Sequence, residues 1–299
     1  MTAIKAQDLT GSMVALVTPM DQKGQIDFAQ WESLIKWHIK AGTDALVVAG
    51  TTGESAMLSE KEFEELIRTC KQICDGTDTL IIAGTGAISP DEVLKKNQLV
   101  YNLGADAALV VTPYYIRVTQ AALVAHYRYI ADQSELPIIL YNVPGRTGMD
   151  IETNTSQSLS KHPNIIGIKE AKADMQRVAT LAKLNDFAVL SGDDDSFFEA
   201  MKLGADGVIS VAANIRPKAT KAICTAMQLG DISLAEQLNQ SLTTSYQLMS
   251  AEPNPGPVKS ALMAAEIIGP GIRKPLTTMS LSKQSHKQLI TNIIEEFES

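Results

Sequence analysis

LGADAALVVTP, residues 103–113, is the stretch that decides the fold. Its glycine suits the left-handed cap of a helix, and the apolar run after the aspartate is typical of a buried strand. The pattern recurs as KAGTDALVVAG at 40–50 and as LGADGVISVAA at 203–213. The sequence therefore predicts a helix, a tight turn and a strand at three places along the chain.

Other apolar runs of strand length lie between these repeats. They are SMVALVTP (12–19), TLIIAGTG (79–86), PIILYNVP (137–144), NIIGIKEA (164–171) and FAVLSGDD (187–194). Near-continuous apolar runs are typical of parallel strands buried on both faces. The amphipathic stretches between them predict helices at 27–41, 59–74, 89–103, 119–132, 173–184 and 217–229. Eight such units predict an α/β protein with a closed (β/α)8 barrel, a TIM barrel.

The main alternative is an open doubly wound sheet that binds a nucleotide. GTGAIS (84–89) begins like a dinucleotide fingerprint, but Ser89 stands where the third glycine belongs, and no P-loop GK[ST] occurs. We therefore assign 1–225 to the barrel and 226–299 to a helical extension packed on it. Within the extension, the prolines of AEPNPGPVK (251–259) predict a rigid bend but no chemistry.

Composition excludes several classes of function. The 45% hydrophobic and 20% charged content is typical of a globular protein, and a net charge of −8 without a Lys/Arg run argues against nucleic-acid and membrane partners. The N-terminal stretch lacks the apolar core of a secretory leader, so we expect a cytoplasmic protein. Cys70, Cys74 and Cys224 match neither a disulfide framework nor a zinc pattern, and the first two fall on an apolar helical stripe.

The histidines and paired acids do not indicate a metal site. His38, His126, His162 and His286 lie on or near predicted helices without HExxH spacing, so we expect structural or solvent roles and no metal. The acids of SGDD (191–194) are interpreted as the N-terminal cap of a helix over 195–203.

Barrel enzymes carry their sites at the carboxyl ends of the strands, and one such end holds a lysine. Alternation places Ile165, Gly167 and Lys169 on one face, so Gly167 would leave space beneath the lysine side chain. An apolar interior favours a neutral amine, which can attack a carbonyl and form an imine. The residues leave another interpretation open, in which Lys169 reaches solvent or pairs with Glu170 or Asp193.

Hydroxyl groups at other strand ends favour the imine. Imine chemistry needs proton transfer, which Tyr141, Thr51, Thr52 and Tyr115 can supply. The amides of GTTGES (50–55) and the forked guanidinium of Arg146 are candidate carboxylate-binding groups.

Six motifs, in this order and spacing, resemble the dihydrodipicolinate synthase and N-acetylneuraminate lyase family of Schiff-base-forming pyruvate aldolases. They are GTTGES, VTPYY, YNVPGRTG, GIKEA, SGDD and EPNPGPVK. The resemblance implies a lyase that condenses pyruvate with L-aspartate 4-semialdehyde to 4-hydroxy-tetrahydrodipicolinate, on the route to lysine and diaminopimelate. The arginine of PGRTG and the threonine pair favour this activity over an N-acetylneuraminate lyase or 2-keto-3-deoxy sugar acid aldolase. A non-catalytic carboxylate-binding barrel is the alternative from another class.

The resemblance also implies a role for each site residue. Lys169 would form the imine with pyruvate and need no cofactor. Tyr141, Thr51 and Tyr115 would form a proton relay, with Tyr115 reaching in from a neighbouring subunit of a homotetramer made of two dimers.

Thr52 and the amides beside it would hold the pyruvate carboxylate, with the carbonyl of Ile209 beside the site. Arg146 would bind the carboxylate of the semialdehyde.

A lysine-binding regulatory site is the last implication of the resemblance. The positions that match its lining are Ser55, Ala56, Glu92 and Tyr114. However, Glu60, Phe63 and Ile88 stand where lysine-sensitive bacterial members carry two histidines and an asparagine. Because polar contacts to a charged ligand are lost there, we expect weak or absent inhibition by lysine.

Overall fold

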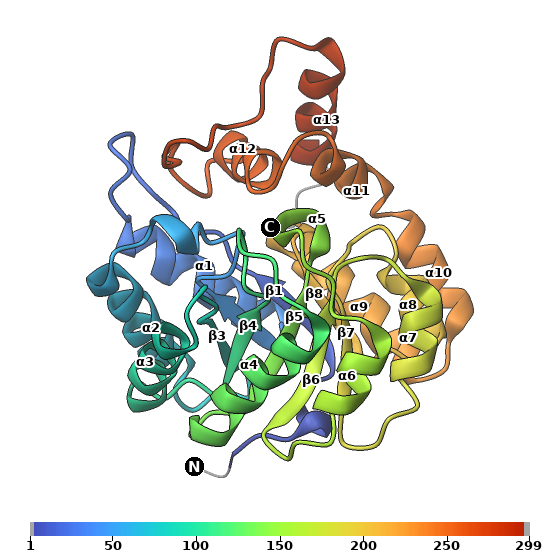
Figure 1. Ribbon diagram of the computed structural model, residues 1–299. Helices are drawn as coiled ribbons and strands as arrows, with labels where there is room; N and C mark the ends of the chain where they lie inside the picture. The colour runs from blue at the N-terminus through green and yellow to red at the C-terminus, as the bar shows by residue number, and fades with distance from the viewer. Residues whose placement is uncertain (1–2, 296–299) are drawn as a thin grey trace. The chain divides into compact units, whose positions relative to one another are not determined.

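A computed structural model describes residues 3–295, and within them eight parallel strands form a closed barrel in chain order (Figure 1). The strands are β1 (Gly11–Ala15), β2 (Ala45–Val48), β3 (Leu80–Gly84), β4 (Ala107–Val111), β5 (Ile138–Asn142), β6 (Ile165–Glu170), β7 (Ala188–Ser191) and β8 (Gly207–Ser210). Seven of them fall within the apolar runs named above, and β1 begins one residue before its run. The predicted (β/α)8 barrel is confirmed.

Helices separate the strands, as the alternating pattern predicts. They are α1 (Phe28–Ala41), α2 (Glu60–Cys74), α3 (Pro90–Asn102), α4 (Gln120–Gln133), α5 (Pro144–Thr147), α6 (Thr153–Leu159), α7 (Met175–Leu181), α8 (Phe197–Lys202) and α9 (Pro217–Gln228). Only α5 and α6 were not predicted. The first is a single turn, and the second, TNTSQSL, is rich in residues of low helix propensity.

The helical C-terminal part is also present. It contains α10 (Ile232–Gln240), α11 (Thr243–Ser250), α12 (Gly256–Ala264) and α13 (Gln284–Glu295), drawn in orange to red in Figure 1. Short 3-10 turns lie at η1 (Ala6–Asp8), η2 (Ser55–Met57) and η3 (Ala212–Asn214). None of the helices within residues 3–295 is both long enough and apolar enough to cross a membrane.

By its internal contacts the chain divides into two compact units. The first comprises Met1–Gly11 and Leu80–Ile209, and the second comprises Ser12–Thr79 and Ser210–Ser299. The first unit therefore carries β3 to β7, whereas the second carries β2 and the helices that follow β8. The predicted division near residue 225 stays a prediction.

The aspartate of each repeated stretch has the same structural task. The carboxylates of Asp44, Asp106 and Asp206 accept hydrogen bonds from the amide of the second residue of β1, β3 and β7, at 2.7, 2.8 and 2.8 Å. Buried backbone amides need such acceptors wherever the sheet ladder does not supply one. In each repeat, therefore, the aspartate of the turn holds the start of the preceding strand by a side-chain hydrogen bond.

Helix α2 shows how local sequence sets an element. Its capping box joins Ser59 and Glu62, with the Ser59 amide donating to the Glu62 carboxylate at 2.9 Å. Its buried stripe includes Cys70 and Cys74, and Cys224 is buried in α9, so the expectation of helix packing for the first two cysteines is confirmed.

The histidines lie on or beside helices, as predicted. His38 is buried in α1, where burial lowers its pKa to about 3, and burial lowers the pKa of His126 in α4 to about 4. Nε2 of His162 lies 2.9 Å from an Asp132 oxygen, and His286 lies against the carbonyl of Ser280. Within the described chain, no three His, Cys, Asp or Glu side chains come close enough to hold a metal ion.

Candidate active site

Lys169 and Tyr141 are partners across two neighbouring strands of the first unit. The register of β5 and β6 pairs Tyr141 with Lys169 and Asn142 with Glu170. The side chains of both predicted catalytic residues are buried, since Lys169 is 5% exposed and Tyr141 is 7% exposed. These four residues are the last two of each strand, so the sequence-predicted pair lies at the carboxyl end where barrel enzymes carry their sites.

The amine of Lys169 lies over the aromatic ring of its partner. Its Nζ is 4.6 Å from the centroid of the Tyr141 ring. No carboxylate among residues 3–295 forms an ion pair with this amine: Glu170 pairs with Arg177 at 3.1 Å, and Asp193 accepts a hydrogen bond from the Ser196 hydroxyl at 2.6 Å. The structure therefore gives no support to a lysine that reaches solvent or pairs with either acid.

Gly192 is the glycine that makes room for the lysine. A Cβ placed on Gly192 would lie 2.8 Å from Cε and 3.0 Å from Cγ of Lys169. A Cβ on Gly167 would instead meet the carbonyl oxygen of Ala188 at 2.7 Å. The expectation that Gly167 provides this space is wrong. The side chain of Lys169 lies against Gly192, which follows the neighbouring strand β7, and not against the earlier glycine of its own strand.

The acids of SGDD differ from their interpretation as a cap. Helix α8 begins at Phe197, and its cap residue is Ser196, whose side chain makes no capping hydrogen bond. Asp193 belongs to the turn instead, where its backbone carbonyl accepts from the Ser191 hydroxyl at 3.0 Å.

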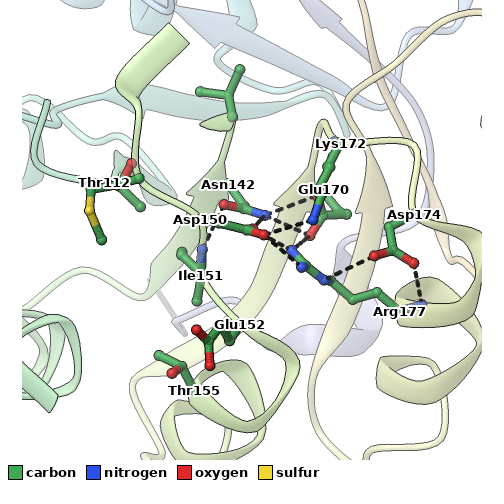
Figure 2. A network of polar contacts seen from close by, with 12 residues as sticks. Thr112, Asn142, Asp150, Ile151, Glu152, Thr155, Glu170, Lys172, Asp174 and Arg177 are labelled. Atoms are coloured by element: carbon green, nitrogen blue, oxygen red, sulfur yellow. Dashed lines mark hydrogen bonds and ion pairs between the residues drawn. The ribbon is translucent and has the colours of Figure 1, made fainter. Parts of the chain in front are cut away.

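A buried polar network lies beside the lysine, on the residues that follow Tyr141 and Lys169. In Figure 2, Asn142, Glu170, Lys172 and Arg177 point toward one another, and Asp150 lies where contacts from three of them meet. The Asn142 amide donates to both Glu170 oxygens at 3.0 Å and to Asp150 at 2.9 Å. Arg177 binds Asp150 at 2.7 Å and 2.9 Å, and Lys172 binds the same carboxylate at 2.8 Å. These contacts fix the ends of β5 and β6 relative to each other.

Charge in this network is balanced by two cations. The Glu170 side chain is fully buried, and burial raises its pKa against the opposing hydrogen bonds from Asn142 and Arg177. For Asp150, burial also acts to raise the pKa, but hydrogen bonds from Arg177, Lys172 and Asn142 outweigh it and hold the pKa well below its ordinary value. Sequence analysis missed Arg177, which lies seven residues after Glu170 with no motif of its own.

Arg146 lies on the single-turn helix α5, just after β5. The turn ends at Gly148, whose φ of +71° suits a glycine, and Thr112 donates to Thr147 at 2.9 Å. Arg146 is an exposed residue of the first unit.

Tyr115 does not join the lysine within its own chain. Its side chain is 93% exposed on the loop after β4, and its φ of +72° is unusual for a residue other than glycine. Ile209, by contrast, is fully buried in β8.

Thr51 and Thr52 belong to the second unit, on the loop after β2. The amides of Gly53, Glu54 and Ser55 donate to carbonyls of this loop. The backbone amides of Thr51 and Thr52 donate to no acceptor among residues 3–295. Two adjacent unpaired amides can bind an anion.

A buried ion pair that sequence analysis missed fixes this loop. The Lys259 amine contacts the Glu54 carboxylate and donates to the carbonyl of Thr18 at 3.0 Å. The two charged side chains are 2% and 0% exposed. Both residues stand in motifs already quoted, GTTGES and EPNPGPVK, but nothing in either motif indicates that the two meet.

The positions matched to a regulatory lysine site are distributed over both units. Ser55 and Ala56 form part of η2 in the second unit, whereas Glu92 on α3 and Tyr114 belong to the first. Phe63 is buried on the apolar stripe of α2. Their part in regulation stays a prediction.

Fold and site together define a (β/α)8-barrel protein with a buried strand-end lysine beside a tyrosine, an arrangement suited to imine chemistry. The family model described as the dihydrodipicolinate synthetase family matches residues 8–294. The chain belongs to that family.

Relatives and solved structures agree with this assignment. A 4-hydroxy-tetrahydrodipicolinate synthase of Stutzerimonas stutzeri is 45% identical over 92% of this chain and 95% of its own length. A crystal structure of the Acinetobacter baumannii dihydrodipicolinate synthase complexed with pyruvate is 43% identical with a TM-score of 0.92, covering 96% of this chain and 98% of that one. The Cyanidioschyzon merolae synthase, solved with lysine bound, is 34% identical with a TM-score of 0.91 and covers 96% and 98%.

Proposed function

We propose that this protein condenses pyruvate with L-aspartate 4-semialdehyde to form 4-hydroxy-tetrahydrodipicolinate, a step toward lysine and diaminopimelate. The observation that carries the proposal is the buried Lys169 amine over Tyr141 at the carboxyl end of β6. The relatives named as this synthase support the choice of substrates. The cytoplasmic location expected from the sequence remains a prediction.

In the proposed reaction, Lys169 supplies the nucleophile and no cofactor is needed. Its neutral amine adds to the keto carbon of pyruvate, water leaves, and an imine forms. Loss of a methyl proton gives an enamine, whose carbon bonds to the aldehyde carbon of the second substrate. The amino group of that substrate then displaces the lysine as the ring closes.

Proton transfer in these steps is assigned to Tyr141, with Thr51 and Tyr115 completing a relay. A phenol can give a proton to the leaving hydroxyl and take one from the methyl group. The contact between Tyr141 and Lys169 supports the first member of the relay. The other two rest on the family resemblance.

Recognition of the two carboxylates is divided between two loops. Thr52, with the unpaired amides of Thr51 and Thr52, would hold pyruvate. Arg146 would bind the semialdehyde, because the fork of a guanidinium matches two carboxylate oxygens. The Ile209 carbonyl would lie beside the bound pyruvate.

We further propose a homotetramer made of two dimers, in which Tyr115 serves a neighbouring site. Its 93% exposure and unusual φ are consistent with a side chain held out for a partner. Mixing Lys169→Ala and Tyr115→Phe chains would then restore activity, because one mixed site has both wild-type residues. Mixing Lys169→Ala with Tyr141→Phe would restore none. Failure of the first mixture, with exchange of subunits verified, would contradict the sharing.

The reaction is tested by borohydride reduction in the presence of pyruvate, followed by intact mass and peptide mapping. We expect one adduct, on Lys169, and none in Lys169→Ala. Lys202→Ala is the matched control, since Lys202 also lies over an aromatic ring, 5.3 Å from the Phe198 centroid, but on the surface. No adduct on the folded wild type at saturating pyruvate would refute the proposal.

Substrate choice is tested separately. Steady-state rates with L-aspartate 4-semialdehyde should exceed those with sugar aldehydes, and the opposite order would favour an aldolase of longer 2-keto acids. Pyruvate binding that survives Lys169→Ala without any turnover of wild type would favour a carboxylate-binding barrel.

A further inference from the structure

The proline-rich segment at 251–259 contacts the loop that carries Thr52. Both lie in the second unit. Nδ2 of Asn254 donates to the hydroxyl oxygen of Thr52 at 2.9 Å, and the Thr52 side chain is 2% exposed. The buried Thr52, whose own amide and that of Thr51 are unpaired, thus receives a hydrogen bond from a residue 202 positions later in the chain.

The direction of this hydrogen bond decides what the threonine can do. A hydroxyl has one hydrogen to donate and two lone pairs that accept. Because the Asn254 amide occupies a lone pair of Thr52, the Thr52 hydrogen stays available for an acceptor such as a carboxylate. An acceptor at position 254 would take that hydrogen and turn a lone pair toward the ligand instead.

The same segment also holds the backbone of the loop. Lys259, five residues after Asn254, contacts the Glu54 carboxylate, and the backbone amide of Arg273 donates to that carboxylate at 2.9 Å. The Thr18 hydroxyl donates to the carbonyl of Gly53 at 2.8 Å. The loop that would bind pyruvate is therefore tied to three other segments of the second unit by the two residues that follow Thr52.

These ties have a conformational reason. Glu54 has a φ of +60°, in the left-handed region that residues other than glycine seldom adopt. Such a conformation persists only where surrounding contacts determine it. The buried pair of Lys259 with Glu54 provides such contacts, so the bend after Thr52 depends on a residue from the C-terminal helices.

We propose that Asn254 is a positioning residue for pyruvate recognition, which fixes the Thr52 hydroxyl with its hydrogen available to the bound carboxylate. This inference rests on the proposed function, because it assumes that the Thr52 loop binds the carboxylate of pyruvate. It assigns a task to the proline-rich segment, which closes part of the site without contributing a reacting group.

The test is the pyruvate dependence of borohydride labelling at Lys169 in the full chain. Asn254→Asp has nearly the shape of asparagine but only accepts hydrogen bonds. We expect about a tenfold or greater rise in the half-saturating pyruvate concentration, since hydrogen bonds to charged groups have this weight. Labelling at saturating pyruvate should still reach completion. Asn254→Ala should give a smaller rise in the same direction.

Asn97→Asp is the matched control. Asn97 is also buried, and its amide donates to the Ser134 hydroxyl at 3.1 Å, but it lies on α3 in the first unit. The half-saturating pyruvate concentration of Asn97→Asp should equal that of the wild type. Circular dichroism of each variant shows whether the chain is folded, and Asn254→Ala provides the comparison if Asn254→Asp does not fold.

A double variant separates positioning from simple charge repulsion. In a Thr52→Val background there is no hydroxyl to orient, so Asn254→Asp should raise the half-saturating concentration less than twofold. An equal rise in both backgrounds, or an unchanged value in the single variants, would overturn the inference. No adduct on wild type would instead refute the proposed function itself.

Discussion

The Nζ of Lys169 lies 4.6 Å from the centroid of the Tyr141 ring, and the two residues are register partners on β6 and β5. A phenol and an amine in this relation can share the proton transfers of imine formation. The pairing depends on the strand register, because a shift by one residue would turn one of the two side chains to the opposite face of the barrel wall.

Tyr141→Phe should keep the ring over the amine but remove the hydroxyl. We expect kcat to fall by about a hundredfold or more, because general acid and base catalysis contributes at least that much. Borohydride should still trap the pyruvate adduct, although more slowly. Tyr129→Phe, which removes an exposed hydroxyl bonded to Asp91, is the control for steady-state assays. A Tyr141→Phe enzyme of wild-type rate would contradict the assignment.

Gly192→Ala should displace the Lys169 side chain, and the residues after β6 must also shift because the added Cβ would lie 2.8 Å from Cβ of Ala171. The added methyl group would lie 2.8 Å from Cε of Lys169, so the side chain must move and adduct formation should fall by about tenfold or more. Gly145→Ala is the control, since its added Cβ would have no atom within 4 Å other than those of its chain neighbours and its own helix backbone. The two variants are compared by their labelling rates with pyruvate. Equal rates would show that the contact at Gly192 is unimportant.

Arg177→Met should destabilise the protein strongly. It leaves the buried Glu170 carboxylate without its guanidinium, which costs about 3–5 kcal/mol in free energy of unfolding. Arg68→Met removes a pair whose arginine side chain is 44% exposed, and should change this quantity by about 1 kcal/mol or less. Urea denaturation measures both. Adding Glu170→Gln to Arg177→Met should recover part of the loss, and no recovery would argue against an uncompensated charge as its cause.

The buried His38 should lower the free energy of unfolding as the pH falls below about 6.5. Burial lowers its pKa to about 3, so from about pH 6.5 down to 3 the unfolded chain binds a proton that the folded chain does not. The free energy of unfolding should therefore fall by about 1.4 kcal/mol per pH unit from this group as the pH drops through that range. His38→Gln should remove this component in urea denaturation between pH 6 and 4.5. If the free energy of unfolding fell equally with pH in the variant and the wild type, the prediction would be contradicted.

Lysine should bind weakly or not at all. Phe63 and Ile88 offer no hydrogen bonds, and Glu60 differs from the histidine of lysine-sensitive members, so several kcal/mol of polar contacts are missing. Calorimetry with the Cyanidioschyzon merolae synthase, whose structure has lysine bound, provides the positive control. Micromolar inhibition by lysine in an initial-rate assay would refute this expectation.

Strands and reacting groups were predictable because their signals are local. A continuous apolar run identifies a buried strand, and a lysine or tyrosine at its end is visible in the sequence itself. Gly192 was not predictable, because alternation along β6 says which face Lys169 occupies but not which residue of the neighbouring strand end lies against it. The exposed side chain of Tyr115 is another feature that local pattern does not reveal.

The sequence by itself determined the barrel, the repeated turns with their aspartates, and the candidate pair of Lys169 and Tyr141. Only the tertiary structure decided which charges meet. Glu54 and Lys259 are 205 positions apart, and Glu170 pairs with Arg177 and not with Lys169. The physical reason is that burying a charge is unfavourable without a partner, yet any distant residue of opposite charge satisfies that need. Composition therefore shows that partners exist, and packing selects them.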